Sequence, residues 1–263
     1  MVTKKPTFLN HAKPLVCAIF GEKTPDEFIA DIANSLSQGA EGFCLLMEML
    51  EKKYRNETDL KRIFAACKGL PIYVTACYRG WESADLTDDE RVEYLLLCGR
   101  CGATLLDVMG DLYHPEKKEL TYDEEAVAKQ KALIDKIHEM GCEVLMSSHT
   151  HEFMDEETVV EYALAQQSRG ADIIKIVTMS DNDEQQMANL SIINTLKHTL
   201  DKPFLFLAGG SKCTLIRQIG VFLGSCMYLS VPEYKPARGT FQPVISSSRQ
   251  IRDLMGFGAI YRD

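Results

Sequence analysis

The sequence lacks the features that mark membrane, secreted and nucleic-acid-binding proteins. Its 263 residues contain 29 lysines and arginines against 38 aspartates and glutamates, and the net charge of −9 argues against a nucleic acid or an anionic membrane as partner. No apolar run reaches the roughly 18 residues that cross a bilayer. The first ten residues, MVTKKPTFLN, contain no apolar core of a signal peptide. We therefore expect a cytoplasmic protein.

The cysteine pattern argues against a zinc site and against a disulfide framework. The nine cysteines are odd in number and irregular in spacing. Cys98 and Cys101 form one C-x-x-C string, but no second pair completes a zinc site. Reduced, buried thiols in the cytoplasm are the better interpretation. We expect no metal ion and no organic cofactor.

Apolar strand-like runs alternate with amphipathic runs along nearly the whole sequence, without a linker rich in Pro, Gly or Ser between them. The runs typical of strands are 15–20, 42–48, 71–78, 104–110, 143–149, 172–179, 203–210 and 226–231. The runs typical of helices are 24–39, 58–67, 87–102, 123–141, 155–170, 182–200, 213–224 and 244–258.

Eight strand–helix units predict a single (β/α)₈ TIM barrel that forms one domain over residues 1–263. A doubly wound open sheet is the competing fold, but IFGEKTPDE, after the first expected strand, is not the G-x-G-x-x-G turn that would favour it. Thr24, Pro25 and Glu27 fit the N-cap, N1 and N3 positions of the first helix. We expect the residues before Pro14 to close the bottom of the barrel.

A lysine lies within the branched apolar run of the sixth expected strand, GADIIKIVTMS. Because strand side chains alternate, Lys175 shares a face with Ile173 and Val177, and this face should be the barrel interior. Burial of an unpaired ammonium lowers its pKa and favours a nucleophilic amine. The alternative is a structural ion pair, for which Glu48 and Asp107 are the nearest candidates.

Two histidines follow the fifth expected strand, in MSSHTHEF. His149 at the strand end or His151 in the loop would place an imidazole beside the lysine, and an imidazole is the usual proton carrier near neutral pH. We prefer His149 because a side chain at a strand end is held more rigidly. The alternative is a surface histidine in a loop.

Several basic and polar residues lie in loops and helices at the expected catalytic end. Arg217 follows the glycine-rich turn LAGGSK and fits a carboxylate clamp. The long segment 232–243 is a candidate lid, from which Lys235, Arg238 and Gln242 could reach the barrel mouth. For each residue the alternative is a solvated surface group.

These residues resemble the type I 3-dehydroquinate dehydratase family. The strings MSSH, GADIIKIV and IRQIGVFLGS follow one another as the histidine, lysine and arginine segments of that family do. The resemblance implies that Lys175 forms a Schiff base, that His149 is the general acid–base and that Arg217 binds the substrate carboxylate. Gln242, in ARGTFQP, corresponds to a substrate contact of the family's lid.

The third expected strand matches the family only with a shift. The family has an arginine at the end of this strand and a glutamate four residues later. Here the directly matching position of the arginine is Cys77, whereas Arg79 and Glu82 match after displacement. We expect Arg79 and Glu82 to contact the substrate from the following loop.

The second and fourth expected strands have lost polar groups that the family uses for substrate hydroxyls. Cys44 and Leu46 stand where the family has a glutamate and an arginine, and Asp107 and Met109 stand where it has an aspartate and a glutamate. A pocket that loses such groups changes its specificity. The mechanism is therefore better supported than the substrate.

The leading hypothesis is a hydro-lyase of the shikimate pathway of aromatic amino acid biosynthesis that converts 3-dehydroquinate to 3-dehydroshikimate. One alternative is a Schiff-base lyase or aldolase of the same fold acting on a less hydroxylated keto acid. The other is a catalytically retired barrel, in which Lys175 would have a tight carboxylate partner and no open pocket above it. We expect a small keto acid as the only partner besides a second copy of the chain in a homodimer.

Overall fold

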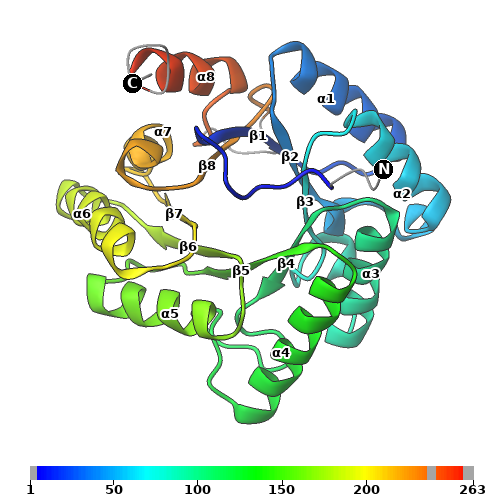
Figure 1. The fold of residues 1–263 in the computed structure, drawn as a ribbon, viewed down its shortest axis with the longest axis horizontal. Helices are drawn as coiled ribbons and strands as arrows, with labels where there is room; N and C mark the ends of the chain where they lie inside the picture. Colours follow the sequence, from blue (N-terminus) through cyan, green and yellow to red (C-terminus); the bar gives the residue numbers. More distant parts are fainter. Residues whose placement is uncertain (1–4, 236–240, 257–263) are drawn as a thin grey trace.

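The computed structural model describes residues 5–235 and 241–256. Eight parallel strands form one sheet in the order β7-β6-β5-β4-β3-β2-β1-β8, which surrounds a central axis (Figure 1). The strands are β1 Leu15–Phe20, β2 Gly42–Leu46, β3 Ile72–Thr75, β4 Leu105–Met109, β5 Glu143–His149, β6 Ile173–Met179, β7 Phe204–Gly209 and β8 Met227–Ser230.

In the described part of the chain one helix follows each strand, and these eight helices form the outer ring. They are α1 Pro25–Ser37, α2 Glu57–Ala66, α3 Asp88–Cys101, α4 Glu124–Glu139, α5 Glu156–Ser168, α6 Asp183–Thr199, α7 Thr214–Leu223 and α8 Ile245–Leu254. The described residues also form three short 3₁₀ helices, namely η1 Met47–Met49, η2 Lys52–Tyr54 and η3 Trp81–Ser83. The TIM barrel predicted from the sequence is confirmed.

The first helix begins where the sequence predicts. Thr24 accepts a hydrogen bond from the Glu27 amide and the Glu27 carboxylate accepts one from the Thr24 amide, so the capping box is complete. Pro25 occupies the first turn, where its missing N–H costs nothing.

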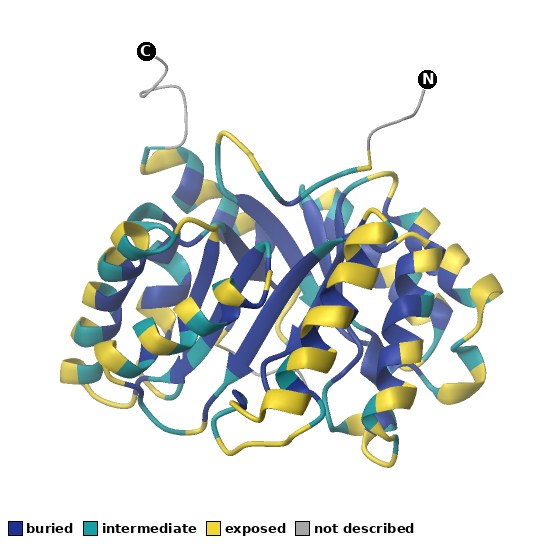
Figure 2. Ribbon diagram, turned by 60° about the horizontal axis from the view of Figure 1, so that its bottom comes forward, coloured by how far each residue is buried: buried dark blue, intermediate teal, exposed yellow. Residues whose placement is uncertain are grey.

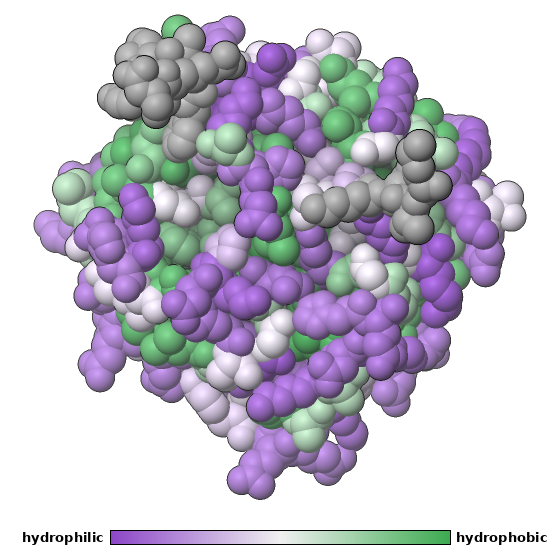
Figure 3. Space-filling view, viewed as in Figure 1, coloured by the Kyte–Doolittle hydropathy of each residue, from purple (hydrophilic) through white to green (hydrophobic). Residues whose placement is uncertain are grey.

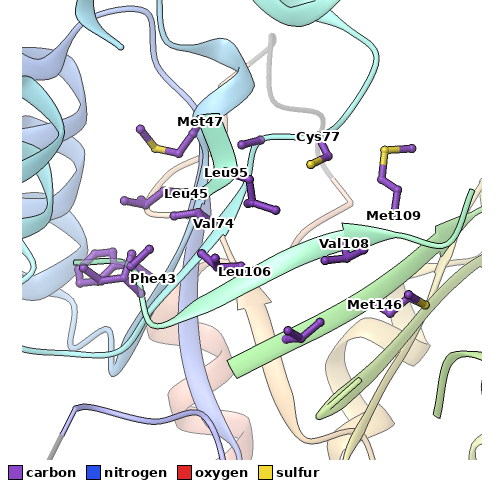
Figure 4. Packing of buried hydrophobic residues seen from close by; sticks show 14 of the residues in the cluster. Phe43, Leu45, Met47, Val74, Cys77, Leu95, Leu106, Val108, Met109 and Met146 are labelled. Atoms are coloured by element: carbon purple, nitrogen blue, oxygen red, sulfur yellow. The ribbon is translucent and has the colours of Figure 1, made fainter. Parts of the chain in front are cut away.

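Two apolar cores stabilise the barrel. The outer core lies between strands and helices and includes Phe43, Leu45, Val74 and Leu106 (Figure 4). The helices therefore bury their inner faces and leave their outer faces exposed (Figure 2). On the face seen in Figure 3, hydrophilic residues predominate, with smaller apolar areas between them.

The inner core fills the barrel itself, and its side chains come from alternate strand positions. Its members are Phe8, Leu15, Cys17, Cys44, Tyr73, Leu105, Leu145, Ile173, Leu205, Leu207, Met227 and Leu229. Phe8 comes from the N-terminal segment, which crosses the near end of the barrel in Figure 1. Its ring meets the Tyr73 ring edge-on at 6.5 Å, and its amide donates to Glu143 at the start of β5. Residues 5–13 thus close the barrel bottom, as the sequence predicts for the segment before Pro14.

The sheet has a seam between β7 and β8. Among the described residues no strand ladder joins these two strands, although the Cys226 amide donates to the Phe204 carbonyl at 2.8 Å. Every other neighbouring pair of strands forms a parallel ladder, and the β5–β6 ladder places Lys175 beside Ser147. The carboxyl ends of all strands therefore meet at the end opposite Phe8, where chemistry in this fold occurs.

Candidate active site

A cavity of about 430 Å³ opens at the carboxyl ends of the strands. Its polar lining residues are Glu48, Thr75, Tyr78, Glu119, His149, Thr150, His151, Lys175, Arg217 and Gln242. Its apolar lining residues are Ile19, Cys44, Leu46, Trp81, Val177, Met179, Leu207, Leu229 and Phe241. The cavity thus brings Lys175, His149, Arg217 and Gln242 together, as the sequence predicts.

Lys175 points into the barrel from the middle of β6, and only 5% of it is exposed. Its Nζ lies 3.1 Å from Tyr73 Oη, 3.4 Å from Tyr78 Oη and 3.7 Å from Asp107 Oδ2. Asp107 also accepts hydrogen bonds from Tyr73 and from Ser147. Two phenols and a shared carboxylate therefore compensate the buried ammonium, and the space above Nζ remains open.

Tyr78 connects Lys175 to His149. Its hydroxyl lies 3.4 Å from Lys175 Nζ and 3.0 Å from His149 Nε2, and the two rings meet edge-on with centroids 4.9 Å apart. Burial, and secondarily the charge of Asp107, raise the pKa of Tyr78 well above its usual range, so the phenol keeps its proton. The hydroxyl can accept from the ammonium while it donates to the imidazole.

Glu119 fixes the orientation of His149. One carboxylate oxygen, Oε2, lies 2.9 Å from His149 Nδ1 and 2.8 Å from the His149 amide nitrogen. A carboxylate only accepts, so Nδ1 carries the proton and Nε2 is the basic nitrogen facing Tyr78. Burial and the charge of Lys175 lower the pKa of His149 below 6.5, and Glu119 partly opposes this shift. The imidazole is therefore neutral at pH 7.

The loop between β4 and α4 holds Glu119 in place. The Glu119 backbone has φ +50°, a left-handed conformation that costs free energy in a residue with a side chain. Ser148 Oγ donates to its carbonyl at 2.7 Å, and Arg169 donates to the carbonyls of Gly110 and Thr121. A Cβ at Gly110 would lie 2.6 Å from the Glu119 carbonyl, so this close approach requires glycine.

A second carboxyl group lies on the opposite wall of the cavity. Glu48 is fully buried in η1, and Thr75 Oγ1 donates to its carboxylate at 2.8 Å. Burial raises the pKa of Glu48 to about 7. Near neutral pH this group therefore exists partly as a carboxylic acid that can donate a hydrogen bond into the cavity.

Arg217 is a buried cation without an acidic partner in the described part of the chain. Its guanidinium donates to the Ala208 carbonyl at 2.8 Å and to Gln242 Oε1 at 2.9 Å, and the Phe241 ring lies 4.8 Å from its central carbon. Among the described residues no carboxylate lies within 4 Å of it. A buried, unpaired guanidinium at a cavity wall is suited to bind an anion. Arg238, the other expected arginine of this segment, lies outside the described residues.

The structure does not bring Arg79 and Glu82 to the cavity. Arg79 Nη1 lies 3.0 Å from both carboxylate oxygens of Asp111, and Nη2 lies 3.0 Å from Asp88 Oδ2. These ion pairs hold the loop after β3 against the loop after β4. Glu82 lies in η3 and does not line the cavity, whereas its neighbour Trp81 does. Reasoning by family position could not foresee that the shifted arginine would find two aspartates.

Of the other residues singled out from the sequence, some line the cavity and others do not. His151 lines the cavity but is exposed, and Cys44 and Leu46 form part of its apolar wall. Met109 and Cys77 do not line the cavity; they belong to the outer core, where Figure 4 shows both. Lys235 pairs with acidic residues Glu22, Asp31 and Glu233 instead of reaching the mouth.

Sequence reasoning missed Tyr73, Tyr78 and Glu119. Tyr73 was detectable, because alternation along IYVT places it on the same interior face as Thr75. Tyr78 and Glu119 lie in loops beyond the strands, where no periodicity predicts direction.

Neither a metal site nor a membrane-spanning helix is found in the described part of the chain. No group of three or more His, Cys, Asp and Glu side chains there is arranged to hold a metal ion. No helix there is long and apolar enough to cross a bilayer. The described cavity offers an amine, an imidazole, a carboxyl group and a guanidinium, which suffice for imine formation and proton transfer.

Comparison with known families gives a match over most of the sequence. The family model of type I 3-dehydroquinase matches residues 16–256. A 3-dehydroquinate dehydratase from Klebsiella pneumoniae strain 342 is 26% identical over 97% of this chain and 98% of that protein. A 3-dehydroquinate dehydratase from Syntrophotalea carbinolica is 30% identical over 40% of this chain and 42% of that protein.

Solved structures agree with the fold. The 3-dehydroquinate dehydratase from Geobacillus kaustophilus superposes with a TM-score of 0.79 at 16% identity, over 92% of this chain and 91% of that chain. The type I 3-dehydroquinate dehydratase from Clostridium difficile, solved with covalently modified comenic acid, gives the same TM-score and identity over 93% of each chain. At this identity the similarity shows the TIM barrel.

Proposed function

Because the chain belongs to the type I 3-dehydroquinase family, we propose that it is a hydro-lyase that binds a cyclic keto acid of the 3-dehydroquinate type and eliminates water from it through an imine on Lys175. The observation that carries this proposal is the open cavity lined by a buried amine, a neutral imidazole and a guanidinium that has no carboxylate partner among the described residues. The open space above Lys175 also argues against a catalytically retired barrel.

The first chemical step is attack of the Lys175 amine on the ketone. The ammonium must lose a proton first, and the Tyr78 hydroxyl provides a path to Nε2 of His149. His149 then returns a proton to the carbinolamine hydroxyl, which leaves as water and gives the protonated imine.

The second step is elimination. The neutral imidazole of His149 removes a proton from the carbon next to the imine, and the imine nitrogen takes up the electron pair. The hydroxyl on the following carbon, which also bears the carboxylate, leaves with a proton and the ring double bond forms. Water then hydrolyses the imine and frees Lys175. In this scheme Arg217 binds the carboxylate and Gln242 orients Arg217 and the substrate.

Borohydride trapping tests the imine directly. With 3-dehydroquinate and borohydride, intact-mass measurement should show a reduced adduct, and peptide mapping should place it on Lys175. Lys175→Met keeps the volume of the stem and removes the amine, so it should fold, lose the adduct and lose turnover. Lys175→Arg should also be inactive, because a guanidinium stays protonated. Full turnover in either variant would contradict imine chemistry at this position.

Three wider features complete the proposal. The continuous eight-stranded sheet supports a single domain over residues 1–263. The nine cysteines, none of which is in a disulfide, fit the reducing cytoplasm. Exposed Leu254 and Met255 at the end of α8 are apolar surface that a second copy would cover in a homodimer, and light scattering of the purified protein would give the oligomeric mass.

A further inference from the structure

A smaller apolar cavity adjoins the lysine cavity. This side cavity has a volume of about 190 Å³ and lies at the carboxyl ends of β1, β2 and β8. Phe20, Gly21, Met49 and Val231 line the side cavity and not the larger one. The residues that line both are Ile19, Leu46, Trp81, Phe241 and Gln242. The shared walls make the two cavities adjoining compartments of one site.

The walls of the side cavity suit an apolar group. Phe20, Leu46, Met49 and Val231 offer only hydrocarbon and sulfur. Among the described lining residues, the polar side-chain groups are the Trp81 indole N–H and the Gln242 amide, whose Oε1 already accepts a hydrogen bond from Arg217. A hydroxyl group placed among these walls would lose its hydrogen bonds to water with little compensation. An apolar group would gain by leaving water.

The positions of Lys175 and Arg217 in the barrel determine which edge of a bound substrate faces the side cavity. Lys175 is on β6, and β2 lies four strands away in the eight-stranded sheet, on the opposite wall. Arg217, on α7 after β7, is next to the Lys175 side. A ring with its ketone at Lys175 and its carboxylate at Arg217 therefore directs its remaining edge toward β1 and β2. In 3-oxocyclohexane-1-carboxylate, that edge is centred on C5, the carbon most distant from both groups.

We propose that the substrate is a cyclic keto acid with an apolar substituent at the position equivalent to C5, and that the side cavity holds this substituent. The inference rests on the proposed imine chemistry and specifies its substrate class. The volume is sufficient, because an apolar cavity of about 150 Å³ accepts benzene. A branched alkyl group or a six-membered ring therefore fits.

Trp81 provides a reporter for occupancy. It is the only tryptophan of the sequence, it is 61% exposed, and it lines both compartments. Its fluorescence should change when a group enters the side cavity, whether or not an imine forms. This separates the substrate inference from the chemical mechanism.

The first experiment compares two ketones in borohydride trapping, 3-oxocyclohexane-1-carboxylate and its 5-phenyl derivative. Each buried methylene equivalent is worth roughly fourfold in affinity. The phenyl compound should therefore reach half-maximal labelling of Lys175 at a concentration at least about tenfold lower. Equal concentrations for the two ketones would overturn the inference.

A matched pair of variants locates the effect. Met49→Gln adds a polar group of similar size to the side cavity alone, and Met179→Gln makes the same change in the larger cavity alone. Met49→Gln should reduce the preference for the phenyl ketone at least about threefold, with labelling by the unsubstituted ketone as its control for folding. Met179→Gln should leave the ratio unchanged. A ratio lowered only by Met179→Gln would place the phenyl group elsewhere and overturn the proposal.

The second experiment removes the ketone. Cyclohexane-1-carboxylate and its 3-phenyl derivative are titrated while Trp81 fluorescence is measured. Tighter binding of the phenyl acid supports the side cavity as a subsite even if neither ketone labels Lys175, a result that would contradict only the imine. Labelling of Lys175 without any preference in either experiment would contradict only the apolar subsite.

Discussion

At the scale of single residues, the site is a chain of hydrogen bonds whose direction the structure determines. Glu119 accepts from Nδ1 of His149, which leaves Nε2 to accept from Tyr78, which in turn accepts from Lys175. The direction of each hydrogen bond is fixed because a carboxylate can only accept hydrogen bonds and an ammonium can only donate them. The proton that blocks the nucleophile thus has a path to the base that needs it.

Replacement of Tyr78 tests this path. Tyr78→Phe removes the hydroxyl between amine and imidazole, so imine formation should slow by roughly tenfold or more, a smaller effect than the roughly hundredfold or greater loss on removing the general acid–base itself. Single-turnover trapping with borohydride measures the step. Tyr73→Phe is the matched control, since its hydroxyl also contacts Lys175 Nζ but hydrogen-bonds to Asp107 instead of His149. Equal slowing in both variants would show that Tyr78 has no special part in proton transfer.

Removal of the imidazoles should separate the two histidines. His149→Ala should lower kcat by about a hundredfold or more, the usual effect of removing a general acid–base. His151→Ala should have a much smaller effect, because His151 is exposed. Steady-state kinetics at pH 7 compare the two. The reverse order of effects would assign the proton transfers to His151.

At the scale of elements, chemistry is divided between rigid strands and the loops that follow them. Lys175 and Asp107 are placed by β6 and β4, whereas Tyr78 and Glu119 come from the loops after β3 and β4. The loop of Glu119 is made rigid by Arg169 and by a backbone conformation that its surroundings enforce. A loop held in this way can position a carboxylate as well as a strand can.

Glu119→Gln should change the pH profile as well as the rate. Catalysis needs neutral His149, so kcat/KM should fall as the pH falls through the pKa of His149, which lies below 6.5. The Glu119 carboxylate raises this pKa, so its neutralisation should lower it further and move the acidic limb to lower pH. The rate at pH 7 should fall too, because the imidazole loses its fixed tautomer.

Glu82→Gln is the control for Glu119→Gln, since Glu82 is a glutamate of the loop after β3 that forms no hydrogen bond or ion pair with His149 in the described structure. The acidic limb of the kcat/KM–pH profile of Glu82→Gln should lie at the same pH as in the unmodified protein. An acidic limb that moves in Glu82→Gln but not in Glu119→Gln would assign the orienting role to the expected residue after β3.

The elements and the site differ in how far the sequence predicted them. All eight strands and eight helices begin and end within a few residues of their expected bounds, because alternation, caps and stops are local signals. The interior direction of Lys175 followed from the same alternation. The partner of His149 did not, because Glu119 reaches it through a left-handed turn in a loop, where neither period nor propensity predicts direction.

At the scale of the whole molecule, the site combines the proposed catalytic groups with apolar residues on the wall expected to set specificity. Cys44 and Leu46, which stand where the sequence resemblance implies polar residues, line the cavity. Met109 was expected in the same wall, but it packs in the outer core, so it does not contribute to the change in specificity. Glu48 remains as the carboxyl group on this side, and its pKa near 7 suits it to donate as well as accept.

This wall predicts slow turnover of 3-dehydroquinate. Each hydrogen bond lost to a substrate hydroxyl costs roughly 1–3 kcal/mol, so two apolar replacements should lower kcat/KM by one to several orders of magnitude. We expect a value below about 10⁴ M⁻¹s⁻¹, the low end of the normal range for enzymes. A steady-state assay of 3-dehydroshikimate formation measures it. A higher value would mean that Glu48 and neighbouring groups restore the missing contacts.

The seam between β7 and β8 is where we expect the barrel to open locally most easily. Arg217 and Gln242 lie on its two sides, one on the helix after β7 and the other beyond β8, and they meet at 2.9 Å. A carboxylate bound to both residues would connect the two sides of the seam, where no ladder of backbone hydrogen bonds joins β7 to β8. Amides of β8 should then exchange with deuterated solvent faster than those of β5 in the free protein and slow down on binding. Ligand binding would thus raise the free energy of local opening across the whole sheet.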